Sequence, residues 1–142
     1  MSLSLSELQL LLPELASTWE GAQIQKLHMN GSATLLLKLR VLGESGVLRI
    51  SIEPEANHLC VVEHRGEVDR EASAFCMLLR RWLKGGRITG LELIGGDRFV
   101  ELRGTRASLK IEMFDARGRF VLCSPEGVVL GFSPHDHPRI GA

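Results

Sequence analysis

The sequence predicts an α+β protein in which two antiparallel sheets, arranged as a β-sandwich or a flattened barrel, are capped by two helices. Two stretches place apolar residues at helical spacing, and each is followed by short segments of alternating polarity with turn residues between them. The two halves also match in apolar register at a spacing of roughly 60 residues, which indicates an internal duplication. Each half has a strand face that it cannot cover alone, so we expect one shared core.

The first helix is expected near the N-terminus. Ser4 and Ser6 are both possible N-caps, and Glu7 follows Ser4 at capping-box spacing. The apolar stripe of this helix comprises Leu8, Leu11, Leu12, Leu15 and Trp19. Pro13 has two interpretations: it kinks a longer helix, or it is the first residue of a shorter one.

Strands follow this helix. Gly21 ends the helix, a strand begins at Ile24, and Asn30-Gly31 marks a hairpin turn. A return strand is expected at residues 34–41, a turn at 43–46, and two further strands at 47–53 and 59–62. A charged link at residues 64–72 then leads to the second helix.

The second helix carries the stripe Phe75, Leu78, Leu79, Trp82 and Leu83. Ser73 lies too late to be an ideal cap, and Gly85-Gly86 suits the helix end, where a positive φ is usually needed. Strand-like alternation then begins at Ile88 and continues at residues 99–103, with Gly95-Gly96 as a two-residue hairpin signal.

The duplication can be aligned residue by residue. Gly21, Ile24 and Leu27 match Gly85, Ile88 and Leu91, and one deletion then brings residues 38–40 onto 101–103, 48–50 onto 109–111, and 59–61 onto 120–122. We therefore expect residues 4–62 and 72–132 to form two copies of a helix plus four strands within one domain, residues 1–134. Residues 135–142 resemble the start of a linker or tail.

Composition excludes several classes of protein. The chain has 142 residues, a hydrophobic content of 44%, and 17 basic against 17 acidic residues, so any nucleic-acid affinity must come from a local patch. Cys60, Cys76 and Cys123 contain no CxxC pair, and we expect buried free thiols without a disulfide or a metal. The N-terminus lacks a cationic signal region and no apolar run reaches about 18 residues, so we expect a cytoplasmic protein with no membrane partner. No motif indicates a cofactor or a small-molecule substrate.

Two groups of polar residues are candidates for RNA contact. The first is a basic cluster off the apolar stripe around one helix end, comprising Arg80, Arg81, Lys84 and Arg87. The second is Asp97-Arg98, which follows a turn signal. We expect an exposed hairpin tip to project both side chains of this pair and the nearby basic cluster to support them electrostatically. The planar guanidinium of arginine suits phosphate, and the neighbouring aspartate could orient it or accept a hydrogen bond from a 2′-hydroxyl. The alternatives are a solvated basic surface and a purely structural turn. His135 and His137 could chelate a metal, but they lie in a Pro-flanked tail, and a flexible pair is a poor site.

These residues carry a family resemblance that extends over about residues 4–134. The motif elements are the run Phe75 to Arg81, then Leu83, Gly85-Gly86-Arg87-Ile88 and Asp97-Arg98. The series resembles the NFACT N-terminal domain of the RqcH/NEMF group, which includes bacterial proteins once called fibronectin-binding protein A. The resemblance implies a fold similar to the N-terminal domain of formamidopyrimidine-DNA glycosylases. It also implies a ribosome quality-control function: binding to the large ribosomal subunit and to tRNA, with the Asp97-Arg98 pair at the tRNA contact.

The sequence departs from the family pattern in one stretch. Residues 112–122 replace the usual Met-Gly step with Phe114-Asp115 and the usual Asn with Arg119. This change and the neutral net charge favour an alternative, a protein-interaction domain that kept the fold without RNA binding. A DNA-glycosylase-like DNA-binding domain ranks third. Enzymatic activity is not expected, because a glycosylase of this fold needs an N-terminal proline followed by an acidic residue and this chain begins Met-Ser.

Overall fold

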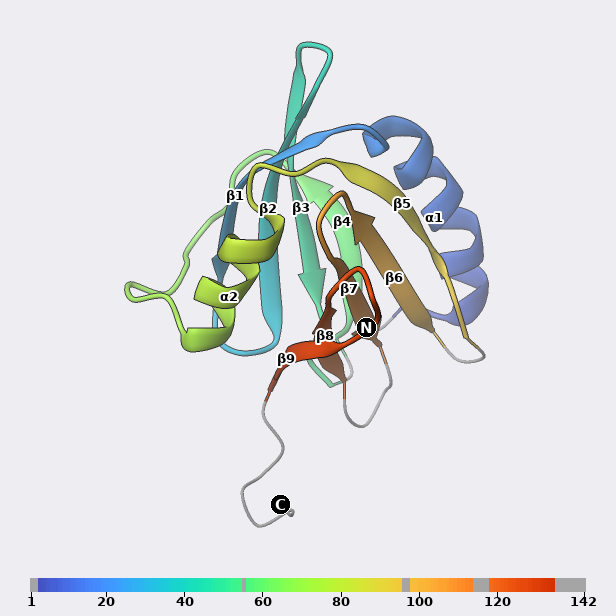
Figure 1. Ribbon diagram of the computed structural model, residues 1–142. Coiled ribbons are helices and arrows are strands. Elements are labelled where there is room, and N and C mark those ends of the chain that lie inside the picture. Colours follow the sequence, from blue (N-terminus) through green and yellow to red (C-terminus); the bar gives the residue numbers. More distant parts are fainter. Residues whose placement is uncertain (1–2, 55, 96–97, 114–117, 135–142) are drawn as a thin grey trace.

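The computed structural model describes residues 3–54, 56–95, 98–113 and 118–134. Two antiparallel sheets pack together, and the helices lie at opposite sides of the molecule (Figure 1). The first half contains α1 (Leu5–Trp19), β1 (Gln23–Met29), β2 (Thr34–Val41), β3 (Glu44–Ser51) and β4 (His58–Val62). The second contains α2 (Ala74–Leu83), β5 (Ile88–Leu93), β6 (Phe99–Gly104), β7 (Ser108–Glu112), β8 (Arg119–Cys123) and β9 (Val129–Ser133).

Both sheets are meanders. Their strand orders are β1-β2-β3-β4 and β5-β6-β7-β8-β9, so strands that follow one another in sequence also pair in space. The predicted α+β architecture is confirmed as a sandwich, since the described strands form two open sheets and no closed barrel. The prediction of four strands in each half was incomplete, because β9 adds a fifth strand to the second sheet.

The two halves meet around an approximate two-fold axis. Gln23 at the start of β1 forms a β-bridge with Arg87, the residue before β5. Around this bridge, residues at a constant sequence offset exchange equivalent backbone hydrogen bonds. The Gly21 N–H bonds to the Ile88 carbonyl at 2.7 Å, and the equivalent Gly85 N–H bonds to the Ile24 carbonyl at 2.8 Å. Likewise, the Ile24 N–H bonds to the Gly86 carbonyl at 2.8 Å, and the equivalent Ile88 N–H bonds to the Ala22 carbonyl at 2.9 Å. This reciprocity gives the predicted duplication a physical basis at the point where the halves join.

The strand registers correct one part of the predicted alignment. Leu37 of β2 lies opposite Leu27, and Leu102 of β6 lies opposite Leu91. Leu102 therefore corresponds to Leu37 and not to Leu39, so the alignment of residues 38–40 with 101–103 was wrong by two positions. Because side chains alternate with a period of two, the slip kept the correct residues on the buried face.

The helices form from the predicted stripes. Ser4 caps α1 in a capping box with Glu7, with bonds of 2.8 and 3.1 Å in the two directions. Pro13 lies inside α1, so the interpretation as the start of a shorter helix is wrong. Ser73 was judged a poor cap, yet its hydroxyl accepts the N–H of Cys76 at 3.1 Å and begins α2.

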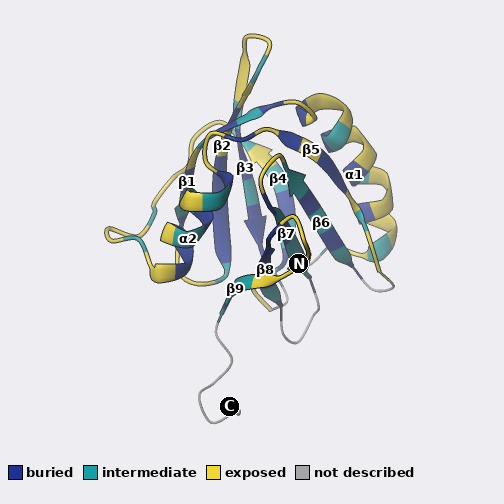
Figure 2. Ribbon diagram, in the orientation of Figure 1, coloured by how far each residue is buried: buried dark blue, intermediate teal, exposed yellow. Residues whose placement is uncertain are grey.

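Each helix packs mainly on the opposite half of the chain. α1 lies against β5 of the second sheet, and α2 lies against β1 of the first. Most strand residues and the inner sides of both helices are buried, while the outer sides of both helices are exposed (Figure 2). Neither sheet therefore covers its own apolar face, which is the packing reason why the duplicated halves share one core.

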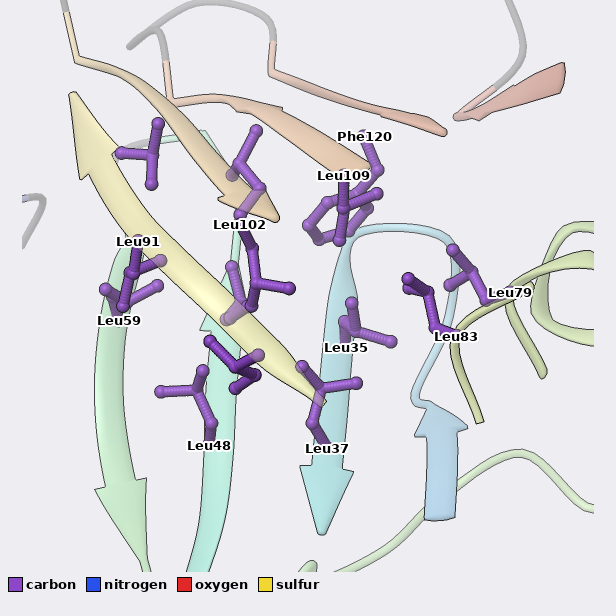
Figure 3. Packing of buried hydrophobic residues seen from close by; sticks show 14 of the residues in the cluster. Leu35, Leu37, Leu48, Leu59, Leu79, Leu83, Leu91, Leu102, Leu109 and Phe120 are labelled. Carbon is purple, nitrogen blue, oxygen red and sulfur yellow. The ribbon is translucent and has the colours of Figure 1, made fainter. Parts of the chain in front are cut away.

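The core consists largely of leucine and isoleucine. Leu35, Leu37 and Leu48 of the first sheet face Leu102, Leu109 and Phe120 of the second across the sandwich (Figure 3). Leu79 and Leu83 of α2 close one side of this cluster, and Leu79 is fully buried as predicted.

Two turns differ from their predicted positions. The β2–β3 turn consists of Leu42 and Gly43, with φ values of 45° and 83°, and not of residues 43–46. Positive φ at both central residues is the pattern of a type I′ hairpin, which normally selects Asn-Gly. In the β5–β6 hairpin, the Ile94 N–H bonds to the Phe99 carbonyl at 2.8 Å. This bond leaves residues 95–98 as the connection, which is longer than the predicted two-residue turn.

All three cysteines are free; Cys76 and Cys123 are buried and Cys60 is half-buried. Burial raises the pKa of the Cys76 thiol, which outweighs the opposing effect of Arg80. Within the described ranges, no helix has both the length and the apolar character needed to cross a membrane.

Candidate nucleic-acid interface

Arg98 is the described member of the predicted RNA-binding pair, because Asp97 lies outside the described residues. The prediction of an exposed hairpin residue is wrong for Arg98, which is only 8% exposed. Its guanidinium Nη1 donates to the Leu3 carbonyl at 3.3 Å, and its own carbonyl accepts from the Met113 N–H at 3.1 Å. The Leu3 N–H in turn bonds to the Asn57 carbonyl at 3.1 Å. Arg98 thus helps to fasten the N-terminal residues to both halves of the fold.

The backbone of Arg98 is also unusual. Its φ of 44° lies in the left-handed region, which costs a non-glycine residue roughly 1–2 kcal/mol. Such a conformation is maintained when surrounding contacts fix it, and it is commonly found at functional sites.

The predicted basic cluster divides into two types of residue. Arg81 and Lys84 are exposed near the end of α2, where they complement the helix dipole. Arg80 instead donates through Nε to the Leu27 carbonyl at 2.9 Å and so attaches α2 to β1. Arg87 is exposed but donates through Nη1 to the Gly21 carbonyl at 3.0 Å, beside the two-fold axis.

Arg106 joins this cluster, although the sequence of residues 104–106 indicates only a turn. Its guanidinium donates to the Lys84 carbonyl, and its side chain is exposed. The strand register could have indicated this position. Because Ile88 pairs with Gly104, the residues after β6 must lie next to those before β5. The exposed cations of this surface are therefore Arg81, Lys84, Arg87 and Arg106, which we call the α2-end surface.

Arg98 does not belong to the α2-end surface. Arg87 precedes β5, whereas Arg98 precedes β6 at the opposite end of the β5–β6 hairpin. β5 has six residues, so the two ends are separated by roughly 20 Å. The expectation that the cluster supports Arg98 at close range is therefore wrong, and any ligand that contacts both must be long.

Arg119, which departs from the family pattern, has a packing role. Its guanidinium carbon lies 5.2 Å from the centroid of the Phe132 ring, a cation–π geometry between β8 and β9. Phe114 and Asp115 lie outside the described residues, as do His135 and His137. Among the described residues, no group of three or more His, Cys, Asp or Glu side chains is placed to hold a metal ion.

The model of the NFACT N-terminal and middle domains matches residues 5–135 of this chain. The chain belongs to the NFACT N-terminal domain family. It is 30% identical over 92 residues to the Rqc2 homolog RqcH of Streptococcus pneumoniae and 30% identical over 80 residues to that of Bacillus subtilis. These matches cover 65% and 56% of this chain but 17% and 14% of the relatives, so the chain corresponds to a small part of their length.

Solved structures support the same assignment for this NFACT domain. The N-terminal domain of the fibronectin-binding protein PavA from Streptococcus pneumoniae matches with a TM-score of 0.87 at 25% identity, over 96% of this chain and 57% of that one. The N-terminal part of the fibronectin/fibrinogen-binding protein from Streptococcus suis matches with a TM-score of 0.79 at 21% identity, over 87% and 50% of the two chains. The second likeness, below 25% identity, concerns the fold alone.

Proposed function

We propose that this domain is a non-catalytic RNA-binding module of ribosome-associated quality control, which engages tRNA and the large ribosomal subunit in the cytoplasm. The observation that supports this most is the family membership, together with homology to the N-terminal part of RqcH. A binding role also suits the architecture, because the described core is apolar and the charged residues lie mainly on its outside.

The α2-end surface is the proposed phosphate-binding part of the module. Its four cations are exposed and lie on the last turn of α2 and in two adjoining connections, so they can meet neighbouring phosphates of one RNA backbone. Asp97 and Arg98 remain the proposed tRNA-specific pair. Because Arg98 is nearly buried, its contribution to binding depends on the turn that it fixes as well as on direct contact.

A second candidate function is protein interaction. Relatives of similar fold are named for binding fibronectin, and the net charge of this chain is zero, which does not by itself attract RNA. In this alternative, the α2-end surface would be a solvated basic face.

The two functions can be separated by measuring tRNA binding at two salt concentrations. We expect Arg81→Ala/Lys84→Ala to weaken binding and to lower the slope of log K against log salt by about 0.7–0.9 for each phosphate that the variant no longer neutralises. Lys110→Ala is a matched control, because Lys110 lies on β7, away from the α2-end surface. If the wild-type domain binds no tRNA, or if the double variant and the wild type have the same affinity and slope, the protein-interaction function is favoured.

A further inference from the structure

A basic hollow lies on the outer face of the first sheet, and no candidate site described so far includes it. Lys26 of β1 lies opposite Lys38 of β2, and Lys38 lies opposite Val47 of β3. Leu36 is in the next cross-strand row of the same face. Leu36 and Val47 are nearly fully buried, yet they lie on the side of the sheet that faces away from the sandwich core.

The segment between β4 and α2 forms the wall of this hollow. It returns to β1, where the Asp69 N–H bonds to the Met29 carbonyl at 2.8 Å and the Asp69 carboxylate accepts the Gly31 N–H at 3.0 and 3.1 Å (Figure 1). These bonds fasten the far end of the segment and hold His64 and Arg65 beside the sheet. The resulting hollow has a volume of about 290 Å³, with Leu36 and Val47 among its lining residues.

The charges around the hollow are unbalanced. Lys26, Lys38 and Arg65 line it together with one carboxylate, that of Glu63. In the described part of the chain, none of these three cations has an ion-pair partner within 4.0 Å. Like charges directly opposite on paired strands destabilise a sheet, so the Lys26–Lys38 pair has an unfavourable energy that a bound anion would relieve.

His28 connects the hollow with a second one. The second hollow has a volume of about 580 Å³, shares His28 and Arg65 with the first, and extends to Arg80. The pKa of His28 is lowered by burial and then by the nearby cations Arg65, Arg80, Lys26 and Lys84. The second hollow is lined by the cations Arg65, Arg70 and Arg80 and by the carboxylates of Glu67 and Asp69. Cations therefore outnumber carboxylates from the outer sheet face towards the end of α2, and this elongated arrangement suits a phosphodiester chain better than one isolated anion.

We propose that the hollow binds one nucleotide of a single-stranded RNA segment, with its phosphate between Lys26, Lys38 and Arg65 and its sugar over Leu36 and Val47. The described lining has no Phe, Tyr or Trp ring, so any base stacking is limited to the imidazoles of His28 and His64. Binding is therefore dominated by the phosphate, with little dependence on base identity and strong dependence on salt. The proposal rests on the RNA binding proposed above but uses a separate set of residues.

The test uses a fluorescein-labelled ten-nucleotide oligouridine with the whole chain. We expect Lys26→Gln and Lys38→Gln each to weaken binding by about tenfold, as for the loss of a charged hydrogen bond. Each should also lower the salt slope by about 0.7. Lys110→Gln, the same change on the outer face of the second sheet, should bind as the wild type does. The ring signals of His28 and His64 should shift in NMR spectra as oligouridine is added.

The proposal would be overturned if the wild type binds no oligouridine, if Lys26→Gln and Lys38→Gln both bind as tightly as the wild type, or if the histidine signals stay unshifted at saturation. Uridine monophosphate serves as a second probe, and equal affinity for it and for oligouridine would contradict an RNA strand as the ligand. Binding of oligouridine without any binding of tRNA would refute the proposed function but would still support the hollow as a nucleotide-binding site. Melting curves identify any variant that has unfolded. If Lys26→Gln is unfolded, the oligouridine binding of Lys38→Gln decides whether the proposal holds.

Discussion

Replacement of Arg98 by alanine should destabilise the fold, in contrast to what an exposed turn residue would do. The guanidinium is buried and donates to the Leu3 carbonyl at 3.3 Å, and the Leu3 N–H is held by the Asn57 carbonyl. Loss of a hydrogen bond from a charged group costs about 1.5–3 kcal/mol. Alanine keeps a Cβ at φ 44°, so the backbone cost stays the same and the change reports on the side chain alone.

The assay is the free energy of unfolding from denaturant titration, with thermal melting in parallel. For a chain of 142 residues, the expected loss corresponds to a decrease in Tm of about 4–10 °C. Arg81→Ala is the matched control, since Arg81 is exposed and its replacement should change stability by less than about 0.5 kcal/mol. Equal melting of Arg98→Ala and Arg81→Ala would refute the buried role of Arg98. In that case, any loss of tRNA binding by Arg98→Ala would report on direct contact.

Four further predictions concern the core, one turn, one histidine and the thiols. Leu79→Ala should cost about 2–5 kcal/mol, because Leu79 is fully buried; a change near zero in denaturant titration would contradict this packing. Leu42→Asn should raise the free energy of unfolding by about 0.5–1 kcal/mol, since Leu42 is 99% exposed at φ 45° in a type I′ turn; a destabilised variant would show that Leu42 makes a needed contact. The folded-state pKa of His28 lies below its unfolded value of 6.5, so the unfolded chain binds more protons. The free energy of unfolding should therefore fall as the pH is lowered through about 6.5, and His28→Gln should weaken this dependence. A variant whose denaturation midpoint keeps the wild-type pH profile would count against this role of His28. A thiol reagent should modify Cys60 before Cys76, which is buried and has a raised pKa; the reverse order in a mass-spectrometric time course would be inconsistent with the fold.

The sequence predicted the fold well because the apolar residues follow simple periods. Both helices, eight of the nine strands and the duplication follow from spacing alone. The two-residue slip at Leu39 also had little consequence, because residues two apart on a strand share a face. β9 was missed because it is short and shows no alternation of burial; Val128 just before it and Val129 at its start are both exposed.

The candidate sites were harder to predict because they depend on contacts between distant segments. The buried Arg98 donates to the carbonyl of Leu3, which lies 95 residues earlier in the chain and is brought near only by the complete fold. Arg80 and Arg87 look like surface cations in the sequence, yet each donates to a backbone carbonyl of the opposite half. The Lys26–Lys38 pair becomes visible only once the register of β1 and β2 is known.

Co-sedimentation with purified large ribosomal subunits tests the proposed function most directly. The wild-type domain should pellet with the subunits at low salt, and Arg81→Glu/Lys84→Glu should stay in the supernatant. Lys110→Glu should pellet as the wild type does, because that residue lies on the outer face of the second sheet. A wild-type domain that stays in the supernatant, or a charge-reversed variant that pellets equally well, would contradict an RNA-binding role for the α2-end surface.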